Sequence, residues 1–104
     1  MAQSKKSDKE KFERNAQIYK LLANPKRLEI LHLLDGKEVM VTDLVNTMGI
    51  RKANASQHLA ILRYLKFVTV KRVGKNAFYS LANPKIIESF KIMDQLWKDK
   101  SFSI

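Results

Sequence analysis

Apolar side chains recur at three- and four-residue steps in five stretches of this chain, which predicts five amphipathic helices. The expected helices are residues 8–22, 25–35, 43–48, 52–66 and 84–98. Residues 68–73 are rich in β-branched side chains, and a turn at residues 74–76 separates them from a second apolar run at residues 77–81. This pattern predicts a two-stranded antiparallel hairpin. The expected fold class is therefore mainly α, with one β-hairpin.

The pentapeptide Leu-Ala-Asn-Pro-Lys occurs twice, beginning at Leu22 and at Leu81, each time just before an amphipathic run. An Asn side chain accepts a hydrogen bond from an unpaired amide at a helix start, and Pro at the first helical position loses no bond. We therefore expect helices to begin at Asn24 and Asn83. The sequences that follow the two copies differ, so we interpret them as one capping solution used twice and not as a structural repeat.

Three further residues mark helix ends. Gly36 and Gly49 follow the second and third apolar runs, where glycine is a common helix stop. Thr42 precedes the third run and is expected to cap it. The polar residues 1–7 are expected to be a frayed tail, and residues 8–104 a single domain.

Composition excludes several classes of protein. A chain of 104 residues that is 45% hydrophobic suits one domain, which buries roughly 60 to 70% of its unfolded surface. The chain has no cysteine, which excludes disulfides, thiolate metal sites and thiol redox sensing. Its N-terminal residues carry no apolar core, so we expect neither a signal peptide nor a membrane anchor, and a cytoplasmic location.

Charge is distributed very unevenly along the chain. The net charge is +10, and the window from residue 44 to residue 87 contains no Asp or Glu. Its eight cations are Arg51, Lys52, Arg63, Lys66, Lys71, Arg72, Lys75 and Lys85. A folded surface of one sign repels itself unless a polyanion shares it, and nucleic acid is the commonest polyanion. The alternative is an ordinary solvated basic surface, as in small ribosomal or chromatin-type proteins.

The short helix, the glycine turn, the longer helix and the basic hairpin together predict a winged helix-turn-helix. In the longer helix the apolar spacing turns Ala55, Leu59, Leu62 and Leu65 inward. The side chains left outside are Lys52, Ser56, Gln57, Ala60 and Arg63. Gln57 suits bidentate pairing with adenine, Ser56 donates or accepts, and Ala60 allows close approach to a thymine methyl. This set predicts a helix that lies in the major groove of DNA; the alternative is plain solvent exposure of Ser56 and Gln57.

The segments Leu22-Ala-Asn-Pro-Lys-Arg27, Ser56-Gln-His-Leu59 and Arg72-Val-Gly-Lys75 resemble the ArsR (ArsR/SmtB) family of dimeric winged-helix transcriptional regulators. The resemblance covers roughly residues 20–98. It implies that Ser56, Gln57 and His58 lie on the recognition helix and that the hairpin is a wing that reaches phosphate or the minor groove. The expected DNA-binding residues are Arg51, Lys52, Asn54, Ser56, Gln57, His58, Arg63, Arg72, Lys75 and Asn76.

The chain departs from the metal-sensing members of the family. Met40 and Thr42 stand where many of them have two cysteines. The last helix has no histidine, and His32, within an apolar run, is expected to be a core or boundary residue. Since transition metals prefer thiolate and imidazole ligands, we expect no metal site and no cofactor. Control is then left to a small organic ligand, a protein partner or simple abundance.

Arg51 is a further departure, because the family often has a Ser there as helix cap. The replacement costs about 1 kcal/mol of capping energy. It also adds a cation beside the expected DNA.

The last predicted helix has a wide apolar stripe that a small core does not need. We expect it to pack, together with the first helix, against a second copy of the chain; the alternative is that it covers its own core. The expected dimer interface consists of Phe12, Ala16, Tyr19, Ile86, Ile87, Phe90, Met93, Leu96 and Trp97.

These observations predict a homodimeric regulator of transcription, a repressor in preference to an activator, that binds an inverted repeat in double-stranded DNA. One alternative is an RNA-binding or architectural basic winged-helix protein, for which Tyr64 is the only outward aromatic residue of the recognition helix. A small basic enzyme such as a nuclease is the other. It is disfavoured because the acid-free basic stretch offers His58 and no carboxylate.

Overall fold

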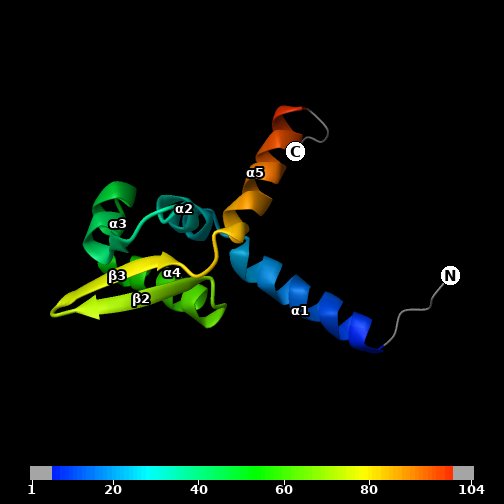
Figure 1. The fold of residues 1–104 in the computed structure, drawn as a ribbon, viewed down its shortest axis with the longest axis horizontal. Coiled ribbons are helices and arrows are strands. Elements are labelled where there is room, and N and C mark those ends of the chain that lie inside the picture. The colour runs from blue at the N-terminus through cyan, green and yellow to red at the C-terminus, as the bar shows by residue number, and fades with distance from the viewer. Residues whose placement is uncertain (1–5, 100–104) are drawn as a thin grey trace.

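The computed structural model describes residues 6–99, with the side chains of residues 8–99 (Figure 1). The elements in chain order are α1 (Lys6–Leu22), α2 (Pro25–Leu33), β1 (Val39–Met40), α3 (Val41–Met48), α4 (Lys52–Tyr64), β2 (Val68–Val73), β3 (Asn76–Leu81) and α5 (Lys85–Lys98). The five predicted helices and the hairpin are confirmed. The first helix begins at Lys6, two residues before its predicted start at residue 8. The rest of the predicted tail, residues 1–5, lies outside the described part of the chain.

The sheet has a strand that the sequence analysis did not predict. The strand order is β1-β3-β2, and both pairings are antiparallel. In β1, Val39 lies opposite Tyr79 and Met40 opposite Phe78. A two-residue strand is too short for any periodicity to show in the sequence. It closes the edge of β3 that faces α3.

The predicted cap of α3 is wrong, and β1 explains why. Thr42 lies inside α3, whose N-cap position is occupied by Met40 with no side-chain hydrogen bond. Because Met40 is also paired with β3, the chain passes directly from strand into helix. Strand pairing therefore sets the start of α3, and no local capping residue is involved.

The two Asn-Pro segments behave similarly but not identically. Asn24 caps α2 as predicted, since its Oδ1 accepts from the amides of Lys26 and Arg27 at 3.0 and 3.2 Å. Asn83 Oδ1 accepts from the amide of Lys85 at 2.9 Å. Here, however, Pro84 is the cap and the helix begins one residue later than in the first copy.

Two helices, α2 and α4, end two residues before the ends that the sequence predicted. The fourth helix ends at Tyr64 and not at residue 66, because Lys66 adopts a left-handed conformation with φ +62°. The amide of Phe67 then donates to the carbonyl of Leu62 at 2.9 Å, which is the bond of a Schellman motif. A lysine in place of the usual glycine does not indicate from the sequence that the helix ends there. Likewise α2 ends at Leu33, although the glycine stop at residue 36 does have positive φ.

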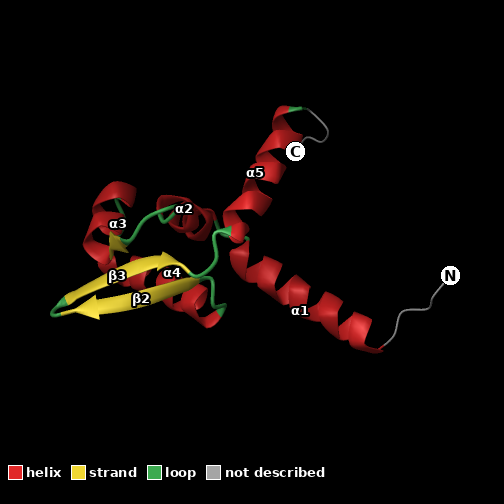
Figure 2. Ribbon diagram, in the orientation of Figure 1, coloured by secondary structure: helices red, strands yellow, loops and turns green. Residues whose placement is uncertain are grey.

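A core of apolar side chains joins α2, α3, α4 and the sheet. The largest fully buried side chains are Ile30, Leu31, Leu34, Leu44, Leu59 and Leu62. Fully burying a Leu or Ile side chain contributes roughly 1.5 to 3 kcal/mol, so these residues hold the body of the fold together. By contrast, α1 and α5 diverge from this body and from each other (Figures 1 and 2). None of the described helices is long and apolar enough to span a membrane.

Candidate nucleic-acid interface

The helix-turn-helix consists of α3 and α4, joined by a turn at Gly49. Gly49 has φ +66° and donates its amide to the carbonyl of Val45 at 2.9 Å, which ends α3 as predicted. In α4, Ala55, Leu59 and Leu62 are completely buried, and Leu65 after the helix is half-buried. The opposite side of α4 therefore has a fixed orientation toward solvent.

The outward side chains of α4 are those that the apolar spacing predicted. We call them the recognition face: Lys52, Ser56, Gln57, Ala60 and Arg63, all of them exposed. Arg51 and Asn54, at the start of α4, are exposed as well. The helix has 13 residues, so it is about 20 Å long, enough to cross the major groove, which is about 12 Å wide.

The wing is the hairpin of β2 and β3, which projects beyond the helices (Figure 2). Its turn is tighter than predicted: Val73 pairs with Asn76, so only Gly74 and Lys75 form the loop. Gly74 has φ +60°, as a two-residue hairpin turn with glycine first requires. Arg72, Lys75 and Asn76 are exposed near the tip, where they extend the positive charge of the recognition face.

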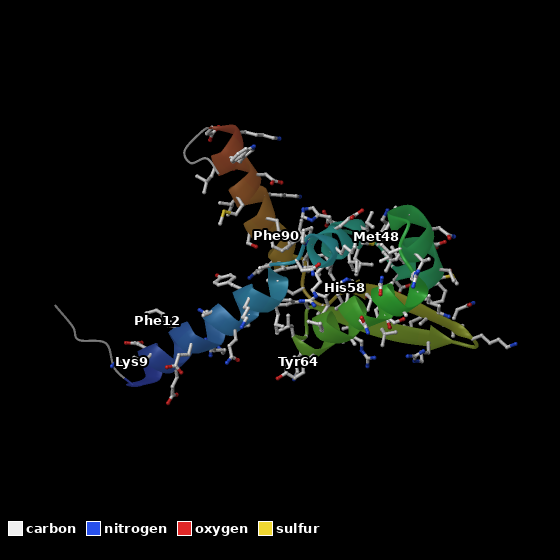
Figure 3. The ribbon with its side chains drawn as sticks, turned by 180° about the vertical axis from the view of Figure 1, so that it is seen from behind. Lys9, Phe12, Met48, His58, Tyr64 and Phe90 are labelled. Atoms are coloured by element: carbon white, nitrogen blue, oxygen red, sulfur yellow. The ribbon has the colours of Figure 1, made fainter. Side chains whose placement is uncertain are left out.

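His58 differs from its neighbours on α4. It is only partly exposed, and its Nδ1 accepts a hydrogen bond from Nε of Arg27 on α2 at 3.2 Å. Figure 3 shows His58 on the inner side of α4. Burial lowers the pKa of His58 below its ordinary value of 6.5, and the positive charges of Arg27 and Lys26 lower it further. The ring is therefore neutral at pH 7 and directed toward α2.

His32 is not in the core. It is exposed, and its Nδ1 lies 2.9 Å from the carbonyl oxygen of Leu28. Its ring stacks on Phe90 of α5, with the ring centres 5.4 Å apart. The apolar run around it is misleading because His32 occupies the outer side of α2. Within residues 6–99 no three His, Asp or Glu side chains come together as they would around a metal ion.

The helices α1 and α5 carry large exposed apolar residues. We call these the apolar surface: Phe12, Tyr19, Ile92, Met93, Leu96 and Trp97, which are between 38% and 69% exposed. Clusters of large exposed apolar side chains often mark sites where another protein binds. Ile92 was missed by the sequence analysis, because it lies beside the predicted stripe.

The other predicted interface residues are divided between the two sides of the helices. Ala16 is exposed, and Ile86 and Phe90 are half-buried against the core. Ile87 is 2% exposed and belongs to the core of its own chain, so it has no area left for a partner. A cavity of about 650 Å³ opens between α1 and α5, with Tyr19, Phe90 and Met93 in its lining. Figure 3 shows Phe12 and Phe90 on these two diverging helices.

Arg27 is the residue that sequence reasoning missed as a functional candidate. Its Nη1 donates to the carbonyl of Leu21, near the end of α1, and its Nε donates to His58 on α4. In the sequence, Arg27 stands out only as the last residue of the Leu-Ala-Asn-Pro-Lys-Arg segment. No local pattern indicates that a side chain in the first turn of α2 contacts two other helices.

Comparison with known proteins agrees with this geometry. The model of the bacterial regulatory protein arsR family matches residues 24–70, which include α2, α3 and α4. The transcriptional repressor SmtB homolog of Synechocystis sp. is 34% identical over 76 residues, which make up 73% of this chain and 58% of the relative. The chain thus spans little more than half the length of that relative.

Two further relatives match more of their length. The HTH-type transcriptional regulator Rv0081 of Mycobacterium tuberculosis is 36% identical over 78 residues, which cover 74% of this chain and 68% of the relative. Its crystal structure, 31% identical, superimposes with a TM-score of 0.77 and covers 88% of this chain and 96% of that one. The homodimeric winged helix-turn-helix DNA-binding domain of Mb0332 from Mycobacterium bovis has a TM-score of 0.79, 26% identity and coverages of 95% and 92%. The chain belongs to the ArsR family of winged helix-turn-helix transcriptional regulators.

Proposed function

We propose that this protein regulates transcription, as a repressor, by binding an inverted repeat in double-stranded DNA as a homodimer. The observation that carries the proposal is the recognition face of α4. Its small and hydrogen-bonding residues, Ser56, Gln57 and Ala60, are exposed between Lys52 and Arg63. The core side chains on the opposite side of α4 hold this face outward.

In this proposal the residues have two kinds of role. Ser56 and Gln57 contact base edges in the major groove, where side-chain amides distinguish adenine. The cations around them contact phosphates and give affinity without sequence preference. These phosphate contacts come from Arg51, Lys52, Arg63, Arg72 and Lys75, and Asn54 and Asn76 add hydrogen-bond donors.

The apolar surface of α1 and α5 supports the homodimer. An inverted repeat presents two identical half-sites about one helical turn apart, and two linked recognition helices are needed to bind both. The Mycobacterium bovis domain with this fold is itself described as homodimeric. We propose that a second copy covers Phe12, Tyr19, Met93 and Trp97, and also the cavity that opens beside them.

The family consists of regulators, and we propose that this chain has no enzymatic activity, acts in the cytoplasm and does not respond to metal ions. Its two histidines, His32 and His58, lie on different helices, and each already has a polar or aromatic partner. DNA binding should be unchanged by Zn²⁺, Ni²⁺ or arsenite. Release of the DNA by one equivalent of Zn²⁺ per subunit, at nanomolar free metal, would contradict this.

Selection of bound sequences from random duplex DNA tests the proposed function. The expected result is an imperfect inverted repeat with half-sites about one helical turn apart. Enrichment of no sequence would indicate an architectural role. Equal or tighter binding to single-stranded RNA would favour the RNA-binding alternative, in which the 79% exposed Tyr64 stacks on a base.

A further inference from the structure

Arg27 connects three helices through a single side chain. Its backbone lies in the first turn of α2, where its amide donates to Asn24 Oδ1 at 3.2 Å. From the guanidinium, Nη1 donates to the carbonyl of Leu21 in α1 at 2.6 Å, and Nε donates to Nδ1 of His58 in α4 at 3.2 Å. Because the guanidinium is planar and rigid, its two donors cannot move independently. The end of α1 and the middle of α4 are thereby held in one geometry.

Each of the two bonds satisfies a group that lacks another partner within its own helix. Leu21 is among the last four residues of α1, whose carbonyls have no amide of the same helix to accept from. The bond from Arg27 therefore acts as a side-chain cap for α1. On α4, the neutral His58 ring accepts at Nδ1, which requires that its proton lie on Nε2.

The helices joined in this way are those with the two proposed tasks. The first helix, α1, carries part of the apolar surface at Phe12 and Tyr19. In α4, Ser56 and Gln57 immediately precede His58 in the sequence. A shift of α1 relative to α4 would change the distance between the two recognition faces of a dimer, and with it the half-site spacing that the dimer fits.

We propose that Arg27 is a positioning residue that locks α1 to the recognition helix through the neutral ring of His58, so that the dimer fits its operator only while His58 is unprotonated. This inference rests on the proposed function of the preceding subsection. It also assigns His58 a role inside the protein, as the acceptor of the lock, in place of the direct DNA contact that the sequence suggested.

Protonation of His58 breaks its hydrogen bond with Arg27, because an imidazolium has no acceptor nitrogen. It also places a second positive charge beside Arg27. The charged groups that act on His58 are Arg27 and Lys26, both of α2. The α4 positions one turn away, residues 54, 55, 61 and 62, carry no charge. The pKa of His58 in the folded protein is lower than 6.5. The hydrogen bond from Arg27 to His58 is therefore intact above pH 6.5 and is lost as the pH falls through the lowered pKa.

The test compares affinity for the selected operator with affinity for a scrambled duplex, at about pH 8 and about pH 5, on either side of the ordinary histidine pKa. We expect the wild-type preference for the operator to fall about tenfold at the lower pH, the effect of one hydrogen bond. His58→Leu removes the acceptor and should show the low preference at both pH values. His58→Asn places Oδ1 near the position of Nδ1 and does not titrate, so it should keep the high preference at both.

Two variants of α2 separate the bond from the charge. Arg27→Lys keeps the positive charge but has one donor group where two are needed, so its preference should be low at both pH values. Lys26→Gln removes a charge from the neighbouring exposed position and leaves the bond in place. It should keep the high preference at pH 8 and move the midpoint of the pH profile upward, because one of the charges that lower the His58 pKa is gone.

Thermal unfolding and sedimentation should show that each variant is folded and dimeric, and His32→Asn controls for the other histidine of the chain. The proposal is overturned if the wild-type preference does not change with pH or if His58→Leu behaves as wild type. It is also overturned if acid strengthens binding to every sequence, as a direct phosphate contact by His58 would. If wild type shows no preference for any duplex at pH 8, the proposed function itself fails. If wild type and all variants prefer the operator over the scrambled duplex to the same extent, the proposed function stands and the role of the Arg27–His58 hydrogen bond is refuted.

Discussion

The two amphipathic helices α4 and α5 have nearly equal lengths, 13 and 14 residues. Their outward sides differ in chemical character. Both bury apolar residues against the same core. Outward, α4 presents hydroxyl, amide and basic side chains, whereas α5 presents Ile92, Met93 and Trp97. The difference shows that the outward side, and not the buried one, indicates the kind of partner. A polar basic side suits a hydrated polyanion, and an apolar side suits another protein surface.

The two surfaces should also respond differently to solution conditions. Contacts between cations and phosphates release counterions, so DNA binding through α4 and the wing should weaken steeply with salt. Burial of apolar area is not screened by salt, so association through α5 and α1 should persist. Four substitutions, from the largest expected effect to the smallest, test this division.

Met93→Asp should have the largest effect, because it places a charge within the apolar surface. Met93 is 58% exposed in the protomer, so the variant should fold but sediment as a monomer. Loss of the second recognition helix should lower operator affinity at least about 100-fold. The matched control is Gln95→Asp, which adds the same charge at an exposed position of α5 outside the apolar surface. A dimeric Met93→Asp protein with normal affinity would show that α5 is not the interface.

Gln57→Ala should cost about 1 to 3 kcal/mol of operator binding energy and relax the base preference at one position of each half-site. The reason is that an adenine edge loses its bidentate partner while the phosphate contacts remain. Repeating the random-DNA selection with the variant measures both effects. Gln95→Ala removes the same side chain from α5 and should change neither. If the Gln57 variant selects the wild-type sequence with wild-type affinity, α4 is not the reading element.

Lys75→Ala should weaken binding to all sequences alike. Removal of one phosphate contact at the wing should reduce the slope of log affinity against log salt by about one unit. The measurement is a salt titration on the operator and on a scrambled duplex. Lys37→Ala, an exposed cation outside the recognition face and the wing, should leave the slope unchanged. A changed base preference in the Lys75 variant would mean that the wing reads sequence.

Arg51→Ser should have the smallest effect. It should stabilise the folded protein and weaken its binding to DNA. Arg51 occupies the N-cap of α4 in extended conformation, with no side-chain capping bond. A serine there should accept a backbone amide and raise the free energy of unfolding by about 0.5 to 1 kcal/mol. The lost cation should lower the salt slope. Denaturant unfolding and a salt titration measure the two changes, and a variant that is stabilised with an unchanged slope would remove Arg51 from the DNA contacts.

The outward sides of the helices were predictable because an amphipathic period determines both sides of a helix at once. Spacing placed Ala55, Leu59 and Leu62 in the core, and the exposed residues of α4 followed. Asn24 and Gly49 gave further correct helix ends because their capping depends on local backbone groups. The second Asn-Pro segment predicted the start of α5 one residue early, since Pro84 is its cap.

Features that depend on distant contacts were not predictable in this way. The start of α3 is set by pairing of β1 with β3. The end of α4 is a local feature, but it depends on Lys66 in a conformation that usually requires glycine, so the residue type does not predict it. The position of His32 could not be deduced from the apolar residues around it. The contacts of Arg27 with α1 and α4 cross sequence separations of 6 and 31 residues, which no periodicity records.

The central claim is that two recognition helices, joined through α1 and α5, bind two half-sites at a fixed distance. The most direct test is the affinity of the wild-type protein for its selected operator before and after about five base pairs, half a helical turn, are inserted between the half-sites. The insertion leaves every base contact available but places the second half-site on the opposite side of the duplex. We expect operator affinity to fall at least about 100-fold, to that of a single half-site. Unchanged affinity would show that the half-sites are bound independently and would contradict the account.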